Sequence, residues 1–185
     1  MEPQNNAADI LLDKLLELRL EAIRRKKAAR AAILRIVLTA AAAYLLFGVV
    51  CGVGFVKGES MEPALFSGDI VLFFRLRSHY AVGDIVLVRT DGSYIKRVAA
   101  LPGQTVDIDN QKTHRLLIDG APAVDDYARG DTFRKTGCSL PLTLGEDEYF
   151  VLGDSRENSV DSRNFGAVRK EQLCGKIIAL LRIEG

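Results

Sequence analysis

Residues 36–56 read IVLTAAAAYLLFGVVCGVGFV and contain no charged side chain. As a helix this run extends about 31 Å, which is enough to cross the hydrocarbon core of a bilayer. A buried core helix is the alternative, but uncharged runs of this length typically span membranes. A cleavable secretory signal has a shorter apolar core and a shorter charged leader. The sequence therefore predicts an uncleaved transmembrane helix over residues 36–56.

The leader, residues 1–35, carries a basic cluster at Arg24–Lys27, followed by Arg30 and Arg35. Positive charge on this flank predicts residues 1–35 in the cytoplasm and residues 57–185 outside it, in a protein of the cell membrane. Apolar residues at 11, 12, 15, 16, 20 and 23 have helical spacing. The sequence leaves open whether this helix lies on the membrane, pairs with a partner helix or is simply solvated.

After Gly58 the apolar pattern changes to a period of two, which indicates β-strands. Asp91-Gly92 is typical of a two-residue hairpin turn, and Asp119-Gly120 indicates another turn. No long amphipathic helix occurs in this part, so we predict a mainly antiparallel β domain over residues 57–185, as a sandwich or partial barrel. The expected strands are 70–76, 84–90, 93–101, 105–109, 114–119, 148–152 and 176–183.

Charge, cysteines and histidines narrow the function. A net charge of +1 gives no general attraction to nucleic acid. Cys138 and Cys174 lie in the part predicted outside the cytoplasm, where disulfides are permitted, whereas Cys51 lies in the apolar run. The sequence leaves open whether Cys138 and Cys174 pair. His79 and His114 have no neighbour at metal-ligand spacing. We therefore expect no metal site, no cofactor and no histidine-based triad.

Ser60 follows the apolar run directly, in GESMEPALFSGDIV (residues 58–71). A serine becomes a nucleophile when a neighbouring base takes its proton. Lys96, in YIKRVAALPGQTV (residues 94–106), is the candidate base, because burial favours a neutral amine. Strand alternation points Lys96 and Arg97 to opposite faces. The alternative is that both are charges on an exposed sheet edge.

A third stretch, GDSRENSVDSRNFG (residues 153–166), follows an apolar strand. Its acids and arginines alternate at short separations. They are expected to form a local network of ion pairs and hydrogen bonds that fixes a loop. The members of this network are Asp154, Arg156, Asp161 and Arg163.

These three stretches, in this order after a membrane span, resemble the serine, lysine and Gly-Asp boxes of the bacterial type I signal peptidases. The resemblance covers nearly the whole chain and implies a signal-peptidase-like antiparallel β catalytic domain behind a transmembrane helix. It implies Ser60 as nucleophile and backbone oxyanion donor, and Lys96 as general base. Ser159 would orient the lysine amine. The other supporting residues implied are Arg97, Asp154, Arg156, Asp161 and Arg163.

Three positions depart from the family pattern. Ala64 stands where the family usually has threonine, and Ser155 stands where it usually has asparagine. Gly58 replaces a serine that helps to bind the oxyanion in some members, as in the compact enzymes of Gram-positive type. These departures imply lower activity or an unusual substrate. Residues 104–147 form a short linking segment, so the large accessory subdomain of some relatives should be absent.

The resemblance implies a membrane-anchored serine endopeptidase that removes signal peptides from exported preproteins after small residues in an A-x-A pattern. Its implied partners are signal peptides, the lipid bilayer and the secretion translocon. Two alternatives stay open: a specialised peptidase for pilin-like or other surface proteins, and a catalytically idle, membrane-anchored binding module. A soluble self-cleaving repressor with the same serine and lysine is disfavoured by the membrane span.

Three short matches mimic the penicillin-recognising enzymes, namely Ser93-x-x-Lys96, Lys135-Thr136-Gly137 and Ser162-x-Asn164. In those enzymes the serine and lysine share one helix face. Here a strand places residues at that spacing on opposite faces. The order of the matches also differs from that family, so we reject this interpretation.

Overall fold

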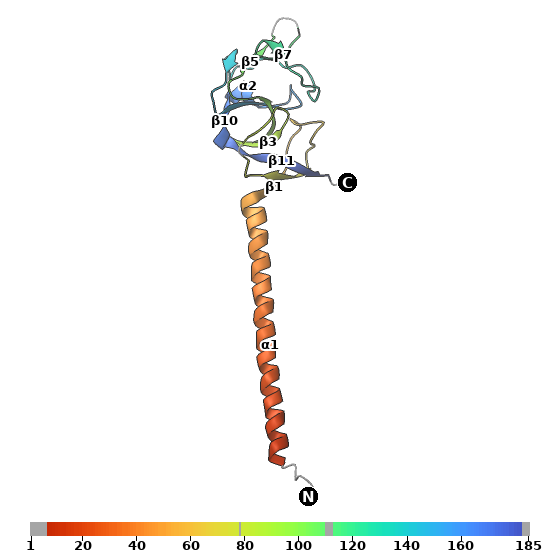
Figure 1. The fold of residues 1–185 in the computed structure, drawn as a ribbon. Helices are drawn as coiled ribbons and strands as arrows, with labels where there is room; N and C mark the ends of the chain where they lie inside the picture. The colour runs from red at the N-terminus through yellow and green to blue at the C-terminus, as the bar shows by residue number, and fades with distance from the viewer. Residues whose placement is uncertain (1–6, 78, 110–112, 183–185) are drawn as a thin grey trace. The chain divides into compact units, whose positions relative to one another are not determined.

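The computed structural model describes residues 7–77, 79–109 and 113–182 (Figure 1). The chain divides into two units, residues 1–46 and residues 47–185. In the first unit, one uninterrupted helix, α1 (Ala7–Tyr44), includes both the predicted leader helix and the start of the apolar run. It continues as a π-helix, η1 (Leu45–Val50). The helical segment Ile10–Val50 is long and apolar enough to cross a membrane, and its most apolar window has a mean hydropathy of 2.2.

The predicted helix over residues 36–56 is wrong at its C-terminal end. The helix stops at Val50, and Cys51–Phe55 form the strand β1, which pairs with β2 (Ile70–Phe74). Gly52 allows β1 to pack closely against the side chain of Phe73, because a Cβ at this position would lie 2.2 Å from the ring.

The second unit contains a seven-stranded antiparallel sheet in the order β1-β2-β11-β3-β4-β9-β10. Figure 1 shows β1 and β11 at one end of this unit and β5 and β7 at the other. The strands not yet given bounds are β3 (Ile85–Arg89), β4 (Ser93–Ala100), β9 (Glu148–Leu152), β10 (Val168–Arg169) and β11 (Leu173–Leu181).

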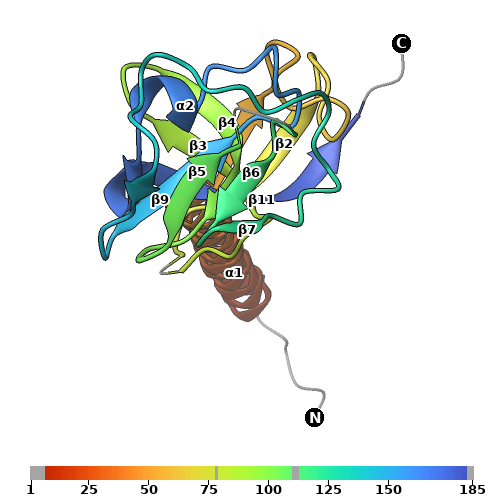
Figure 2. The ribbon, with the colours of Figure 1, turned by 90° about the horizontal axis from the view of Figure 1, so that it is seen from above.

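A four-stranded antiparallel sheet, in the order β7-β6-β5-β8, packs on the larger one through shared buried residues (Figure 2). Two short helical turns, α2 (Ser162–Phe165) and η2 (Lys170–Gln172), precede and follow β10. The strands of the small sheet are β5 (Thr105–Ile108), β6 (Leu116–Ile118), β7 (Ala121–Pro122) and β8 (Leu142–Thr143).

All seven predicted strands are present, although residue 183 of the last one lies outside the described residues, and the antiparallel β class is confirmed. The sequence missed β1, β7, β8 and β10. Asp119-Gly120 forms a two-residue turn between paired Ile118 and Ala121, and both of its φ angles are positive, 52° and 80°, as a type I′ turn requires. The turn at Asp91-Gly92 is longer than predicted, because it spans residues 90–92 between paired Arg89 and Ser93.

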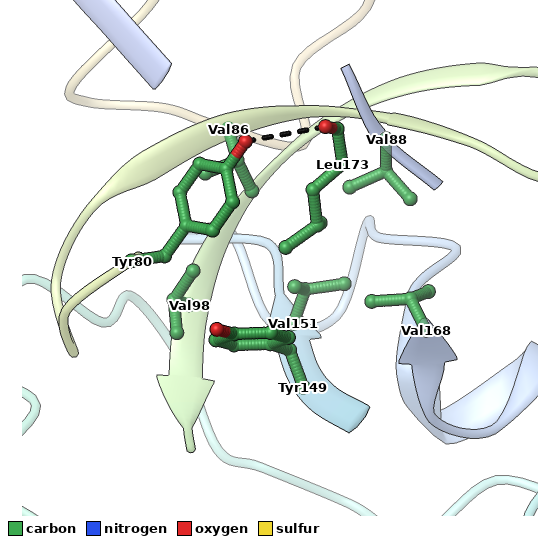
Figure 3. Packing of buried hydrophobic residues seen from close by; sticks show 8 residues of the cluster. All are labelled: Tyr80, Val86, Val88, Val98, Tyr149, Val151, Val168 and Leu173. Carbon is green, nitrogen blue, oxygen red and sulfur yellow. Dashed lines mark hydrogen bonds between the residues drawn. The ribbon is translucent and has the colours of Figure 1, made fainter. Parts of the chain in front are cut away.

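Three clusters of buried residues form the core. Figure 3 shows the first cluster, in which the Tyr80 hydroxyl also donates a hydrogen bond to the Leu173 carbonyl at 3.2 Å. Its other members are Val86, Val88, Val98, Tyr149, Val151 and Val168. The second cluster joins the two sheets and consists of Ala99, Ala100, Val106, Ile108, Leu116, Leu144, Phe150 and Leu152. The third cluster consists of Val56, Met61, Leu65 and Val71.

The three cysteines, Cys51, Cys138 and Cys174, are all free. The pairing of Cys138 with Cys174 that the sequence left open is therefore not formed in this structure.

Candidate active site

Ser60 is held in place by its apolar neighbours. Met61 and Leu65 are buried in the third cluster, and the Leu65 amide donates to the Met61 carbonyl at 2.9 Å. The short turn between them follows β1 and leaves Ser60 half-buried. The Ser60 carbonyl accepts a hydrogen bond from the Ser155 amide at 3.1 Å. The serine is thus tied both to the core and to the loop at residues 153–166.

Lys96 lies on β4 and is only 2% exposed. Its Nζ atom donates a hydrogen bond to Ser60 Oγ at 2.7 Å. Burial lowers the pKa of Lys96 from 10.5 to about 8, although the charges of Asp161 and Asp154 oppose the shift. The structure therefore brings Ser60 and Lys96 together as expected, and Lys96 is not an exposed edge charge. Their catalytic roles remain predictions.

Arg97 points away from Lys96 and pairs with Asp154. Its Nε donates to Asp154 Oδ1 at 2.8 Å, its second terminal nitrogen donates to the other carboxylate oxygen, and its guanidinium lies 4.4 Å from the centre of the Tyr127 ring. Arg156 is fully buried and forms an ion pair with Asp125 at 2.8 Å. The expected local ion pairs are therefore wrong for Asp154 and Arg156, whose charged partners lie far away in the sequence. The expected local hydrogen bonds do form at Arg156, whose Nε donates to the Gly153 carbonyl at 3.2 Å and whose carbonyl accepts from Arg163.

Asp161 and Arg163 do form the expected local pair, and both are buried. Two hydrogen bonds join them, Nε to Oδ1 and Nη2 to Oδ2, each 2.8 Å long. Burial raises the pKa of Asp161, but the hydrogen bonds and charge of Arg163 outweigh burial, so the pKa lies below its usual value. Asp161 also accepts from the Gly153 amide at 3.1 Å and caps α2. The pair thus connects the loop to the short helix.

Ser159 is 2% exposed, and its Oγ has no partner with hydrogen-bond geometry among the described residues. It lies near enough to Asp161 to help lower the pKa of that carboxyl. A hydrogen bond from Ser159 to Lys96, which the expected orienting role requires, is not formed in this structure. The Ser159 carbonyl instead accepts a hydrogen bond from Lys135 Nζ.

Gly153 allows the parts of the site to approach closely. A Cβ at this position would lie 2.2 Å from Ser159 Oγ and 2.6 Å from the Ser60 carbonyl oxygen. The sequence pattern predicted no role for Gly153, Lys135, Asp125 or Tyr127. Residues 121–147, which include the last three, are rich in Gly, Pro, Asp and Thr, and this composition indicates a loop without singling out any side chain.

A groove of about 500 Å³ has Ser60 and Lys96 in its wall. It is bordered by residues 53–58 along β1 and residues 93–96 along β4. β1 is an edge strand, and β4 pairs with β9 only from Arg97 onward, so both borders have backbone groups without a strand partner. Aliphatic and aromatic side chains, among them Val71, Phe73, Leu87 and Ile177, also line the groove.

A second hollow, of about 440 Å³, adjoins Ser60 through Glu59 and Ser155. Its lining is polar and includes Glu62, Arg129 and Glu157. Among the described residues, no group of three or more His, Cys, Asp and Glu side chains could hold a metal ion.

A buried lysine hydrogen-bonded to a serine, beside a groove on an antiparallel β domain, defines a site of the serine–lysine hydrolase type. The family model described as "Signal peptidase, peptidase S26" matches residues 29–181. The chain belongs to this family and is a serine peptidase.

Relatives in Bacillus agree with this assignment. Signal peptidase I P of Bacillus subtilis subsp. natto is 33% identical over 134 residues, which cover 65% of this chain and 71% of the relative. Signal peptidase I of Bacillus amyloliquefaciens is 35% identical over 132 residues, covering 65% of this chain and 70% of the relative. The crystal structure of a signal peptidase I from Enterococcus faecalis matches 55% of this chain and 98% of its own, with 27% identity and a TM-score of 0.45.

We predict that Gly153→Ala inactivates the peptidase. The new Cβ would force Ser60 and Ser159 apart, and a displacement of about 1 Å costs on the order of 100-fold in kcat/KM. Gly145→Ala is the matched control, because the nearest atom to its Cβ is the flexible Glu148 carboxylate at 3.3 Å. Peptide cleavage by Gly153→Ala at the wild-type rate would show that this close packing does not fix the site.

Proposed function

We propose that this protein is a membrane-anchored endopeptidase that removes N-terminal signal peptides from exported preproteins, with Ser60 as nucleophile and Lys96 as general base. The observation that carries the proposal is the 2.7 Å hydrogen bond between Lys96 Nζ and Ser60 Oγ at the groove. Burial supports the role of the lysine, because a pKa of about 8 leaves a useful fraction of neutral amine near neutral pH.

The reaction follows from this geometry. The neutral amine of Lys96 takes the Ser60 hydroxyl proton, and Oγ attacks the scissile carbonyl carbon. The Ser60 amide N–H donates to the developing oxyanion. The Lys96 ammonium then gives its proton to the leaving amine, and an ester remains on Ser60. A water molecule that loses a proton to Lys96 attacks this ester, and Lys96 returns the proton to the departing Ser60 Oγ, which frees the carboxylic acid product and restores the enzyme.

The polar residues around Lys96 have supporting roles in this proposal. The Ser159 hydroxyl, which is buried beside the dyad without a partner, orients the lysine amine once that amine is neutral. The remaining residues fix the loop that carries Ser159 and the strand that carries Lys96. They are Arg97 with Asp154, Asp161 with Arg163, and Arg156.

The groove suits an extended peptide. Its two borders have free backbone groups, which pair with a strand inserted between them. Because side chains alternate along a strand, residues −1 and −3 of the substrate face the same wall. In this proposal, that wall accepts small residues at both positions, in an A-x-A pattern. The larger groove, which aliphatic and aromatic side chains line in part, receives the end of the signal peptide, and the polar hollow beside Glu59 receives the first residues of the mature protein.

The apolar helix indicates membrane anchoring. We further propose that residues 1–35 lie in the cytoplasm, that the span begins at Ile36, and that residues 57–185 lie outside with the catalytic site. The basic residues before the span support this orientation. Anchoring also raises the effective concentration of preproteins held in the same bilayer or delivered by the secretion translocon.

Gly58, Ala64 and Ser155 depart from the family pattern, and these departures favour a second candidate function, a specialised peptidase for pilin-like or other surface proteins. The dyad geometry argues against an idle binding module, because binding alone does not need a buried lysine beside a serine. A panel of ordinary and pilin-like preproteins, compared by kcat/KM, separates the two peptidase functions.

Substitutions in the dyad test the proposal directly. We expect Ser60→Ala and Lys96→Ala each to abolish cleavage of a purified preprotein, because one removes the nucleophile and the other removes the base. Lys96→Arg should fail as well, because a guanidinium group does not give up its proton. Circular dichroism is the control for folding. Wild-type turnover by folded Lys96→Ala would disprove the dyad.

The pH dependence tests the base. On a peptide with alanine at −1 and −3, kcat/KM should rise about tenfold per pH unit below the Lys96 pKa of about 8 and level off above it. A rate that stays flat from pH 5 to 10 would contradict the mechanism. A rise in kcat/KM centred near pH 6.5 that disappears in His79→Ala or His114→Ala would also contradict the mechanism.

Protease accessibility tests the orientation. In right-side-out vesicles, added protease should digest the domain after Lys57 and spare the leader around Lys26, because only the domain faces outward. Detergent-opened vesicles are the control, in which both parts should be cut. Cleavage near Lys26 in sealed vesicles would overturn the orientation.

A further inference from the structure

Lys135 lies in the segment between β7 and β8 and is half-buried. Its Nζ donates a hydrogen bond to the backbone carbonyl of Ser159, the residue whose hydroxyl is buried without a partner beside the dyad. The lysine therefore binds the main chain of the active-site loop from a distant part of the sequence.

The backbone on both sides of Lys135 is fixed against the same loop. On one side, the Phe133 carbonyl accepts a hydrogen bond from Arg163 Nη1 at 3.3 Å. On the other side, Gly137 packs so closely that a Cβ would lie 1.7 Å from the Asn164 carbonyl oxygen. With an anchor two residues away in each direction, Lys135 is directed toward Ser159 by the fold rather than by a chance surface contact.

Four charged groups act on the Lys96 amine. Asp161 and Asp154 favour its charged form, whereas Lys135 and Arg163 favour its neutral form. The ring of Tyr94 lies 5.9 Å from the amine as well. Two hydrogen bonds bind Arg163 to Asp161, so the positive charge of Arg163 is largely offset. Within the described part of the chain, Lys135 forms no ion pair, and its bonded partner is a neutral carbonyl. Burial and the charge of Arg163 lower the pKa of Lys135, and the charge of Asp161 opposes them.

We propose that Lys135 is a positioning residue of the Ser60–Lys96 site: it fixes the Ser159 main chain beside the dyad and supplies a nearby positive charge that is not held in an ion pair. The inference rests on the proposed function, in which Lys96 is the base. Its positive charge makes a second ammonium nearby less favourable, so Lys135 keeps more of Lys96 in the neutral form that takes the Ser60 proton.

Three variants of the full-length protein in detergent separate the charge from the hydrogen bond. Lys135→Met removes both the charge and the donor. Lys135→Gln removes the charge and keeps an N–H donor for the Ser159 carbonyl. Lys135→Arg keeps the charge and a donor.

Arg134→Met is the matched control. Arg134 anchors the same segment, through the Ile108 and Leu140 carbonyls and an ion pair with Asp107. It is not among the charged groups that act on Lys96.

The readout is kcat/KM from pH 5.5 to 10 on a peptide with alanine at −1 and −3. We expect Lys135→Met and Lys135→Gln to move the rising part of the pH profile of kcat/KM to higher pH. The loss of kcat/KM at pH 7 should then exceed the loss at pH 9.5 by about threefold or more. Lys135→Arg should restore the wild-type pH profile. Arg134→Met should lower thermal stability and leave the pH profile in place.

The proposal would be overturned if Lys135→Gln lost the same fraction of kcat/KM at every pH, or if Arg134→Met shifted the pH profile in the same way. Lys135 would then be a structural anchor only. If Lys135→Met does not fold, Lys135→Gln decides the outcome. NMR titration of the Lys96 amine gives an answer independent of turnover. An unchanged titration in Lys135→Gln overturns the proposal, whereas a wild type that titrates as expected but cleaves no signal peptide rejects the proposed function alone.

Discussion

The active site depends on one unfavourable arrangement, the burial of the Lys96 amine against Ser60. In the folded protein the pKa of Lys96 is about 8, below the 10.5 of an ordinary lysine. The unfolded chain therefore binds more protons between these two values, so the contribution of Lys96 to the free energy of unfolding rises with pH across that window. Below pH 8 the charged amine of Lys96 lowers the free energy of unfolding by the full amount, about 3 kcal/mol.

The loop at residues 153–166 holds this arrangement together through buried ion pairs rather than apolar packing. Asp161 with Arg163 closes the loop locally, and Asp154 with Arg97 joins it to the strand that carries Lys96. Removing one partner of such a pair leaves an uncompensated buried charge, which costs about 3–5 kcal/mol. The same acids favour the charged form of Lys96. Burial outweighs these carboxylates and keeps the lysine weakly basic, and the positive charges of Lys135 and Arg163 act in the same direction as burial.

The sequence predicted those features that local pattern encodes. Alternating apolar residues identified seven strands, and the positive φ angles of Asp119-Gly120 agree with its turn signal. Strands of two residues, such as β7, β8 and β10, are too short to show an alternating pattern. The strand β1 shows none either, because it consists of glycines and apolar residues at the end of a longer apolar run. The pairing of Arg156 with Asp125 and the contact of Lys135 with Ser159 join distant segments, so spacing alone could not predict them.

The titration of Lys96 itself is the most direct test of this account. Lysines labelled with ¹³C at Cε report protonation of each amine by NMR, and loss of one signal in Lys96→Met assigns the resonance. The account predicts a midpoint near pH 8 in the folded protein, returning to the ordinary lysine range on unfolding. A folded-state midpoint above about 10, the value of an exposed lysine, would contradict the claim that burial prepares Lys96 to act as the base for Ser60.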